Sequence, residues 1–160
     1  MKSVFIFLLS LLPILSFGQR LSTTFNDDYS RWRFDGMTIN TVFSGNINSW
    51  NADGIRIRTT FNDDWDRWKV GNDITIRTIF NNDYDSWEIV GEGKTIRIKT
   101  TFNNDFERWE VSGDIDGRMS TVFMKDFSRW NIDVEFAGVS EDMRMAVLFI
   151  AVFTANLVHQ

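Results

Sequence analysis

Residues 55–70 read Ile-Arg-Ile-Arg-Thr-Thr-Phe-Asn-Asp-Asp-Trp-Asp-Arg-Trp-Lys-Val. This segment is one copy of a repeat that occurs, with variations, six times in the chain, and the repeat determines the fold. Each copy has a Phe that is followed seven residues later by a Trp. The six pairs are Phe25/Trp32, Phe43/Trp50, Phe61/Trp68, Phe80/Trp87, Phe102/Trp109 and Phe123/Trp130. A repeat of this length predicts that each copy is one supersecondary unit and that neighbouring units bury a shared core.

The residues on both sides of the Phe–Trp segment alternate between apolar and polar. In the copy quoted above, Ile57 and Thr59 alternate with Arg56 and Arg58 before the Phe, and a shorter run with the same pattern follows the Trp. Alternation with period two predicts a β-strand with one apolar face. The repeated Phe, Trp, Thr and Ile positions are therefore all expected to face the inside of the fold.

The segments between these strands have the composition of turns. Asn and Asp fill the Phe–Trp segment, as in 62–64, and they tolerate left-handed backbone and bond to nearby amides. Asp-Gly pairs such as 35–36 and 53–54 link one unit to the next, which is a strong hairpin signal. Residues 19–136 are thus predicted to form six hairpins, or about twelve antiparallel strands in a meander.

Two architectures could hide the continuous apolar face of such a meander: a closed barrel, or an open solenoid stacked on a partner. A flat sheet would leave two edges that invite aggregation. The strands near Leu21 and Phe136 are well formed, and the one proline is Pro13, outside the repeats. We therefore expect a mainly β fold in which the meander closes into a barrel.

The end of the chain predicts a helix over residues 140–158. Ser140 is a suitable N-cap, with Glu141 and Asp142 at the positive end of the helix dipole. Residues 145–158 carry no charge, and a helix that is apolar all round is either buried or in a membrane. This uncharged run is short for a helix that spans a membrane. A twelve-stranded barrel has a backbone radius of about 12 Å, enough for a central helix about 10 Å across. The helix is expected to fill the barrel.

Residues 1–18 have the features of a signal peptide. Lys2 gives the positive start, residues 4–15 the apolar run, and Gly18 the small residue before cleavage. We predict export to the periplasm or outside the cell, leaving residues 19–160 as a single domain. The chain has no Cys, so this domain must be held together by packing alone.

A closed twelve-stranded barrel around a hydrophobic C-terminal helix resembles the tubby C-terminal domain, phospholipid scramblases and the plant LURP-one-related proteins. The six-fold repeat also looks like the shallow symmetric barrels described as β-flowers. The resemblance is one of architecture, and it implies a surface that binds phosphoinositide headgroups through basic residues. The net charge of -5 instead argues against nucleic acid and against an anionic membrane surface as partners.

The acidic residues of the Phe–Trp segments are candidate calcium ligands, because oxygen-rich loops can bind Ca²⁺. The strongest candidates are Asp64, Asp66, Asp83 and Asp85. The alternative is that these carboxylates cap turns and pair with the Arg three residues later, as Asp64 would with Arg67. No segment matches the EF-hand pattern, and the alternative needs no metal or other cofactor.

Aromatic residues recur four positions after the Phe and are candidates for a ligand-binding rim. These candidates are Tyr29, Trp65, Tyr84 and Phe106. Aromatic rings beside Asp and Asn resemble a sugar-binding surface. The alternative is that the rings cover the open end of the hydrophobic interior.

Basic residues alternate with the apolar ones on neighbouring strands and are expected to point outward. They are Arg56, Arg58, Arg77, Arg97 and Lys99. They could form a basic surface that binds an anionic ligand. The alternative is that they are solvated and form ion pairs across the sheet with Glu88 and Glu110.

Catalysis has little support in this sequence: the one His is His159, and no Cys or Gly-rich phosphate loop occurs. We predict no catalytic residues and a non-enzymatic, exported domain that binds a small molecule, glycan or protein. The alternatives are a membrane-associated lipid-binding protein with its C-terminal helix facing lipid, and a hydrolase. Function is expected where the copies disagree, as in 44–46 and 83–86, because positions on which they agree serve the repeat.

Overall fold

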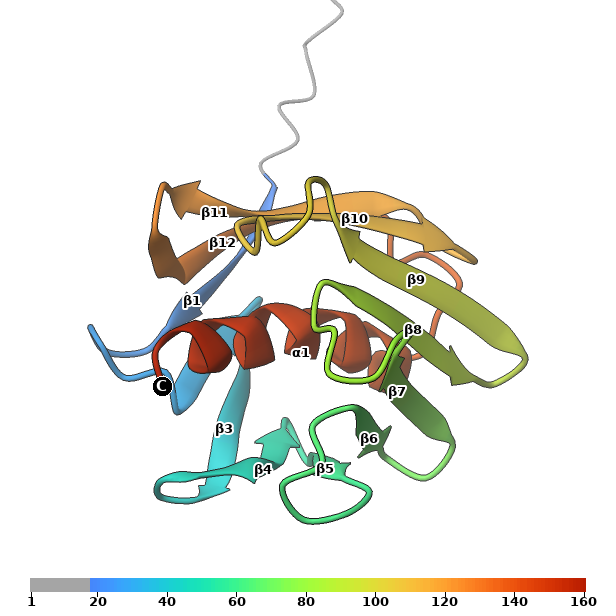
Figure 1. Cartoon of the computed structure of the whole chain (residues 1–160), viewed down its shortest axis with the longest axis horizontal. Helices are drawn as coiled ribbons and strands as arrows, with labels where there is room; N and C mark the ends of the chain where they lie inside the picture. The colour runs from blue at the N-terminus through green and yellow to red at the C-terminus, as the bar shows by residue number, and fades with distance from the viewer. Residues whose placement is uncertain (1–17) are drawn as a thin grey trace, which may run out of the picture.

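The computed structural model describes residues 18–160, and it confirms the predicted fold (Figure 1). Twelve antiparallel strands form a closed barrel with one C-terminal helix. The predicted signal peptide lies, apart from Gly18, outside the described residues. The strands are β1 (Gln19–Thr23), β2 (Arg31–Phe34), β3 (Met37–Phe43), β4 (Asn46–Ala52), β5 (Ile55–Thr59), β6 (Arg67–Val70), β7 (Ile74–Thr78), β8 (Ser86–Gly91), β9 (Lys94–Thr100), β10 (Arg108–Gly113), β11 (Gly117–Phe123) and β12 (Asp126–Val134).

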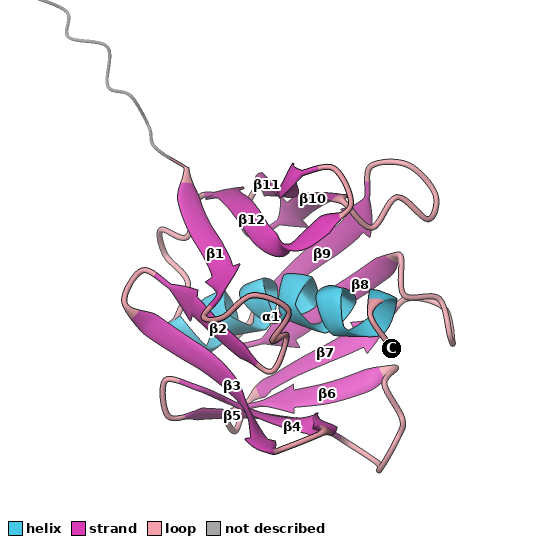
Figure 2. Cartoon of the chain, turned by 90° about the vertical axis from the view of Figure 1, so that its left-hand side faces the viewer, coloured by secondary structure: helices cyan, strands magenta, loops and turns pink. Residues whose placement is uncertain are grey.

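Each strand pairs with its neighbours in the sequence, and β1 pairs with β12 to close the barrel (Figure 2). Within every hairpin the repeated Thr lies opposite the repeated Trp, as Thr59 does opposite Trp68. Between hairpins the Trp lies opposite a residue two places before the next Thr, as Trp68 does opposite Ile76. Since this register recurs at all six junctions, the hairpins are related by rotation about the barrel axis, and equivalent residues lie at equal heights.

The helix α1 (Glu141–Val158) runs through the barrel (Figures 1 and 2). It begins as predicted: the Ser140 hydroxyl accepts a hydrogen bond from the backbone N–H of Met143 at 3.2 Å. Its residues from Met145 to Asn156 are all buried. Among the described residues, no helix combines the length and the apolarity that crossing a bilayer requires.

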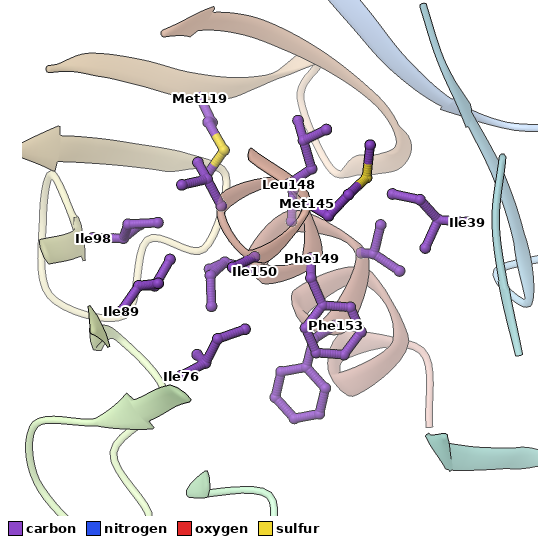
Figure 3. Packing of buried hydrophobic residues seen from close by; sticks show 14 of the residues in the cluster. Ile39, Ile76, Ile89, Ile98, Met119, Met145, Leu148, Phe149, Ile150 and Phe153 are labelled. Atoms are coloured by element: carbon purple, nitrogen blue, oxygen red, sulfur yellow. The ribbon is translucent and has the colours of Figure 1, made fainter. Parts of the chain in front are cut away.

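Aromatic side chains of the helix pack against the repeated Trp of the wall. Figure 3 shows two of these side chains, Phe149 and Phe153, on the helix among apolar side chains of the core. The ring of Phe149 lies 5.8 Å from Trp50 and 4.8 Å from Trp68, in edge contact with both. Phe153 makes similar contacts with Trp68 at 5.2 Å and Trp87 at 5.6 Å. Edge contacts of this kind are favoured by the charge distribution of aromatic rings. The helix is thus the centre of the hydrophobic core, and the six Trp form the layer around it.

Every repeated Trp also satisfies its one polar group. The indole Nε1 donates to the backbone carbonyl of the residue three places earlier, at 2.7–2.9 Å. The acceptors are Tyr29, Ile47, Trp65, Tyr84, Phe106 and Phe127. A buried indole without a partner would be costly. The bond therefore keeps Trp in the core and fixes each Phe–Trp segment against it.

The start of the helix is held at the end of the barrel formed by the links between units. Arg144 pairs with Asp35 at 3.3 Å and with Glu141 at 3.7 Å. Its guanidinium lies over the rings of Phe34, at 5.0 Å, and Phe136, at 5.4 Å. We call this end the turn end. The opposite end, called the loop end, is formed by residues 24–30, 44–45, 60–66, 79–85, 101–107 and 124–125 and receives the C-terminus of the helix.

The prediction that the repeated Phe faces the inside is wrong. The six residues Phe25, Phe43, Phe61, Phe80, Phe102 and Phe123 are all 58–66% exposed. In the third repeat the alternation ends at Thr59, because the chain turns directly after Phe61. The Phe61 carbonyl accepts from Asp64 N at 3.2 Å, and Asp63 takes a left-handed φ of 57°. The turn carries the ring to the outer surface of the loop end.

Candidate functional site

The six Phe–Trp segments at the loop end are equally long, but they differ in the side chain four positions after the Phe, and this difference leaves part of the barrel mouth open. In four repeats residues such as 60–66 lie outside the strands, whereas in the second and sixth repeats the strand pairing continues to a two-residue turn, at 44–45 and 124–125. Five repeats have an aromatic side chain at the fourth position. The second repeat has Ile47 there, beside its short turn at 44–45, so it covers less of the mouth.

A hollow of about 620 Å³ lies at this short turn, and we call it the mouth hollow. It is within the usual size range of small-molecule sites, about 300–1,000 Å³. Its lining comes from the first three repeats and the end of the helix: Tyr29, Gly45, Asn46, Ile47, Asn48, Asn62, Asp63, Trp65, Asn156, His159 and Gln160.

Three aromatic side chains line the mouth hollow. The rings of Tyr29 and His159 are stacked, with centroids 4.2 Å apart and an interplanar angle of 15°. The indole Nε1 of Trp65 donates to Oδ1 of Asn48 at 2.9 Å. The pKa of Tyr29 is raised, first by burial and then by the negative charges of Asp126 and Asp27. The Tyr29 hydroxyl therefore stays protonated at neutral pH and can act as a donor.

The polar lining consists mostly of amides. Asn156, only 9% exposed, donates from Nδ2 to the carbonyls of Tyr29 at 3.0 Å and Val152 at 2.9 Å. Its Oδ1 is left as an acceptor. Asn48 donates to the carboxylate of Asp63 at 2.7 Å, so the one acidic side chain of the lining already has a neutral partner. Apart from the Asp63 carboxylate, the hollow thus presents neutral donors and acceptors beside apolar rings.

The four predicted rim aromatics are divided between two roles. All four are partly buried and pack against the hydrophobic core. Tyr29 and Trp65 line the mouth hollow, whereas Tyr84 and Phe106 do not. Tyr84 lies 5.8 Å from Phe153 of the helix, and its pKa is raised, mainly by burial. These two side chains cover the interior, which was the alternative offered for the whole set.

Two of the predicted calcium ligands are turn caps. Asp64 and Asp83 each accept a hydrogen bond from the backbone N–H two residues later, at 3.2 and 3.3 Å. The same bond occurs at the equivalent position of all six repeats. The predicted ion pairs with the Arg three residues later are not formed: across residues 18–160, the ion pairs involve Arg77, Arg97 and Arg144 instead.

The other two predicted ligands connect neighbouring loops. Asp66 accepts from the backbone N–H of Asn82 in the next loop at 2.9 Å. Asp85 has the same role toward Asn104, and its pKa is raised, first by burial and then by the adjacent Asp83. In the part of the chain that is described, no three His, Cys, Asp or Glu side chains are grouped so that they could hold a metal ion. Calcium binding stays a prediction.

The basic residues of the wall point outward, as predicted, and one of the two expected acidic partners pairs with them. Glu88 accepts from Nε of Arg77 at 3.0 Å and lies 3.5 Å from Nε of Arg97. The hydrogen bond from Arg77 is the main cause of the lowered pKa of Glu88. Glu110 lies opposite Lys99 in the sheet, but within residues 18–160 it forms no ion pair.

A second hollow of about 620 Å³ lies at the turn end, between the start of β1 and the end of β12. Its lining includes Asp35 and Arg144, which already pair with each other. The one aromatic ring of its lining, Phe136, is covered by the Arg144 guanidinium. Gly18, in the same lining, directly follows the residues that the structure does not describe. The mouth hollow is therefore the more completely defined site.

The sequence did not single out several residues of the mouth hollow, among them Ile47, Asn48, Asn156 and His159. Asn156 and Tyr29 are 127 residues apart and meet only because the helix passes through the barrel. One sequence signal did point to the place. The prediction that function lies where the copies disagree included 44–46, and Gly45 and Asn46 line the hollow.

Comparison of the chain with protein-family models, with curated proteins and with solved structures found no match.

Proposed function

We propose that the chain is an exported, non-enzymatic binding domain whose ligand site is the mouth hollow. The observation that carries this proposal is the side chain of Ile47 in the second repeat, at the position where the other five copies have an aromatic ring. This smaller side chain leaves the mouth open between Tyr29 and Trp65, whereas an aromatic ring at the same position elsewhere, such as Tyr84, covers the core. Export is inferred from the signal-peptide features of residues 1–18.

The chemistry of the lining favours a neutral ligand with both hydroxyl groups and an apolar face, such as a short oligosaccharide. Tyr29, Trp65 and His159 offer aromatic rings, against which the apolar face of a sugar can pack. Oδ1 of Asn156 and Nδ2 of Asn46 offer an acceptor and a donor that the described part of the chain does not use. A hydroxyl group can bond to both kinds of partner.

The lining also argues against a hydrolase. Hydrolysis of a glycosidic bond ordinarily uses two carboxyl groups on either side of the bond. The mouth hollow has one, Asp63, and it is bonded to Asn48. His159 stacks on Tyr29 and lies in a lining without Ser or Cys as a nucleophile. The site is suited to holding a ligand without reacting with it.

The likeness to tubby-like and β-flower barrels is proposed as a likeness of architecture. The closed twelve-stranded barrel and its central helix support it. The alternative of a lipid-facing helix has less support, since the apolar residues of α1 from Met145 to Phe153 are covered by the barrel wall.

The proposal is tested by calorimetric titration with a panel of neutral oligosaccharides, using two matched variants. Trp65→Ala and Phe106→Ala each remove an aromatic side chain from the same position of the repeat, but only Trp65 lines the mouth hollow. We expect Trp65→Ala to raise the dissociation constant at least about tenfold, because the ligand loses its contacts with the indole ring. We expect Phe106→Ala to leave the dissociation constant unchanged. Binding to no member of the panel, or equal losses in both variants, would contradict it.

A further inference from the structure

Six exposed aromatic rings surround the loop end, and we call them the phenylalanine ring: Phe25, Phe43, Phe61, Phe80, Phe102 and Phe123. Each is 58–66% exposed, so together they present about 700 Å² of aromatic surface. Ile79 and Met124, beside them in the sequence, are 44% and 82% exposed and enlarge this surface. Exposed apolar side chains that recur at the same position of every copy, all at one end of the fold, are typical of a site of contact with a protein or a membrane.

The fold gives no reason for Phe at these positions. The core is filled by the repeated Trp, by the rim aromatics and by the helix, and the six Phe are not part of it. The loops are shaped by the turn-capping carboxylates and by bonds between loops, such as that from Asn82 to Asp66. The backbone carbonyl of Phe61 takes part in the turn, but any residue supplies a carbonyl. The rings themselves are therefore free to serve a contact.

The phenylalanine ring fits a flat partner. Because the strand register is the same at all six junctions, the six Phe lie at one height around the barrel axis. A surface perpendicular to that axis can touch all six at once. A lipid bilayer is flat on the scale of this barrel, whose backbone radius is about 12 Å.

The charges of the loop end distinguish between the possible flat partners, which are a second copy of the chain, an anionic bilayer and a zwitterionic bilayer. Its loops contain one base, Lys125, and these acids: Asp27, Asp28, Asp63, Asp64, Asp66, Asp83, Asp85, Asp105 and Glu107. Two copies that met through this end would place acids against acids, and an anionic bilayer would be repelled in the same way. A zwitterionic bilayer instead exposes ammonium groups on its outermost headgroups, which complement these loops.

We propose that the loop end docks on a neutral, zwitterionic lipid bilayer, with the phenylalanine ring in the headgroup–acyl boundary and the barrel axis along the membrane normal. Amphipathic surfaces bind this boundary in proportion to the apolar area that they bury. The helix α1 stays inside the barrel. This proposal does not rest on the oligosaccharide ligand, since none of the six Phe lines the mouth hollow.

The test is cosedimentation of the protein beginning at Gln19 with vesicles of pure phosphatidylcholine, which contain no sugar. The double variant Phe61→Ser, Phe80→Ser should lower the partition coefficient about tenfold or more, the effect of removing two partly inserted rings. Phe61→Leu, Phe80→Leu should retain most of the binding, because leucine keeps the apolar surface. Val90→Ser is the control: Val90 lies on β8, away from the loop end, and is 37% exposed.

Thermal melting of each variant shows that it is folded. Since both Phe are 66% exposed, the melting temperature should be nearly unchanged. The proposal is overturned if the unaltered protein does not sediment with phosphatidylcholine vesicles, or binds only when an anionic lipid is added. It is also overturned if the double variant Phe61→Ser, Phe80→Ser binds the vesicles as tightly as the unaltered protein does. If the protein instead forms a dimer that depends on these Phe residues in analytical ultracentrifugation, and does not bind vesicles, the phenylalanine ring is an interface with a second copy of the chain.

Discussion

The indole Nε1 of Trp65 donates a hydrogen bond to Oδ1 of Asn48 at 2.9 Å, and this bond joins the Phe–Trp loop of the third repeat to strand β4 of the second. Asn48 in turn donates to Asp63 at 2.7 Å. The two bonds fix one part of the mouth hollow before any ligand arrives. A preformed site loses less conformational entropy on binding than a mobile one.

Replacing Phe149 by Ala should strongly destabilise the barrel, because this ring packs between Trp50 and Trp68 at the centre of the core. Removing a buried Phe costs about 3–5 kcal/mol of unfolding free energy. Phe80→Ala is the control: this Phe is 66% exposed, and its loss should cost about 0.5 kcal/mol or less. Urea denaturation measures both. Equal costs would mean that the helix does not fill the barrel.

Replacing Trp68 by Phe should lower stability through a lost hydrogen bond as well as lost volume. The bond from Nε1 of Trp68 to the carbonyl of Trp65 is 2.8 Å long, and Phe cannot donate. The unpaired carbonyl and the smaller ring should together cost about 1–3 kcal/mol. Trp109→Phe, at the same position of another repeat, should cost a similar amount. An unchanged denaturation midpoint in both variants would show that the indole bonds contribute little.

Gly113 is predicted to resist substitution for two separable reasons. Its φ is +114°, and a Cβ there would clash with the backbone carbonyl oxygen of Thr95 on the neighbouring strand β9. Gly54 has a φ of +91° but no neighbouring atom within 4 Å. Gly54→Ala should therefore cost about 1–2 kcal/mol for the left-handed backbone alone, and Gly113→Ala more, because a backbone atom cannot move aside without disturbing the sheet. Thermal melting measures both. If Gly113→Ala and Gly54→Ala melt alike, the close approach of β9 does not restrict this position.

Glu88→Gln should reduce stability in a pH-dependent way. Because the folded-state pKa of Glu88 is lowered, its ionised form stabilises the fold above the ordinary pKa of 4.5, and this contribution is lost as the pH falls through the lowered pKa. At neutral pH the variant should lose about 1 kcal/mol or less, since Arg77 is half exposed. Denaturation curves of the two proteins should converge in acid. A constant difference across that range would contradict the role of the Arg77 pair.

The strands, the closure and the central helix could be predicted because each leaves a periodic or compositional signal. Period-two alternation marks β5, and an uncharged apolar run marks α1. The exposed Phe could not be predicted in this way. Alternation places Phe61 on the same face as Thr59, and the sequence pattern does not show that the strand ends before the Phe.

The candidate site was predicted in part. The aromatic positions Tyr29 and Trp65 were found from the repeat, and the short turn at 44–45 from its departure from the repeat. Which aromatics stay accessible depends on the side chains of neighbouring repeats and of the chain's end that pack beside them. One such contact is that of Tyr29, in the first loop, with His159, the residue that follows the barrel's central helix. No local pattern encodes such a contact.

Binding at the mouth hollow is tested most directly by the indole N–H region of a nitrogen–proton NMR spectrum recorded during titration with a neutral oligosaccharide. The chain has seven Trp, and six of them donate to backbone carbonyls inside the wall. Trp65 alone among these seven donates to a side chain of the mouth hollow, and a Trp65→Phe variant assigns its signal. The Trp65 signal is expected to shift most. If no sugar moves it, or if a bound sugar moves other indole signals and leaves Trp65 unchanged, the mouth hollow is not the binding site.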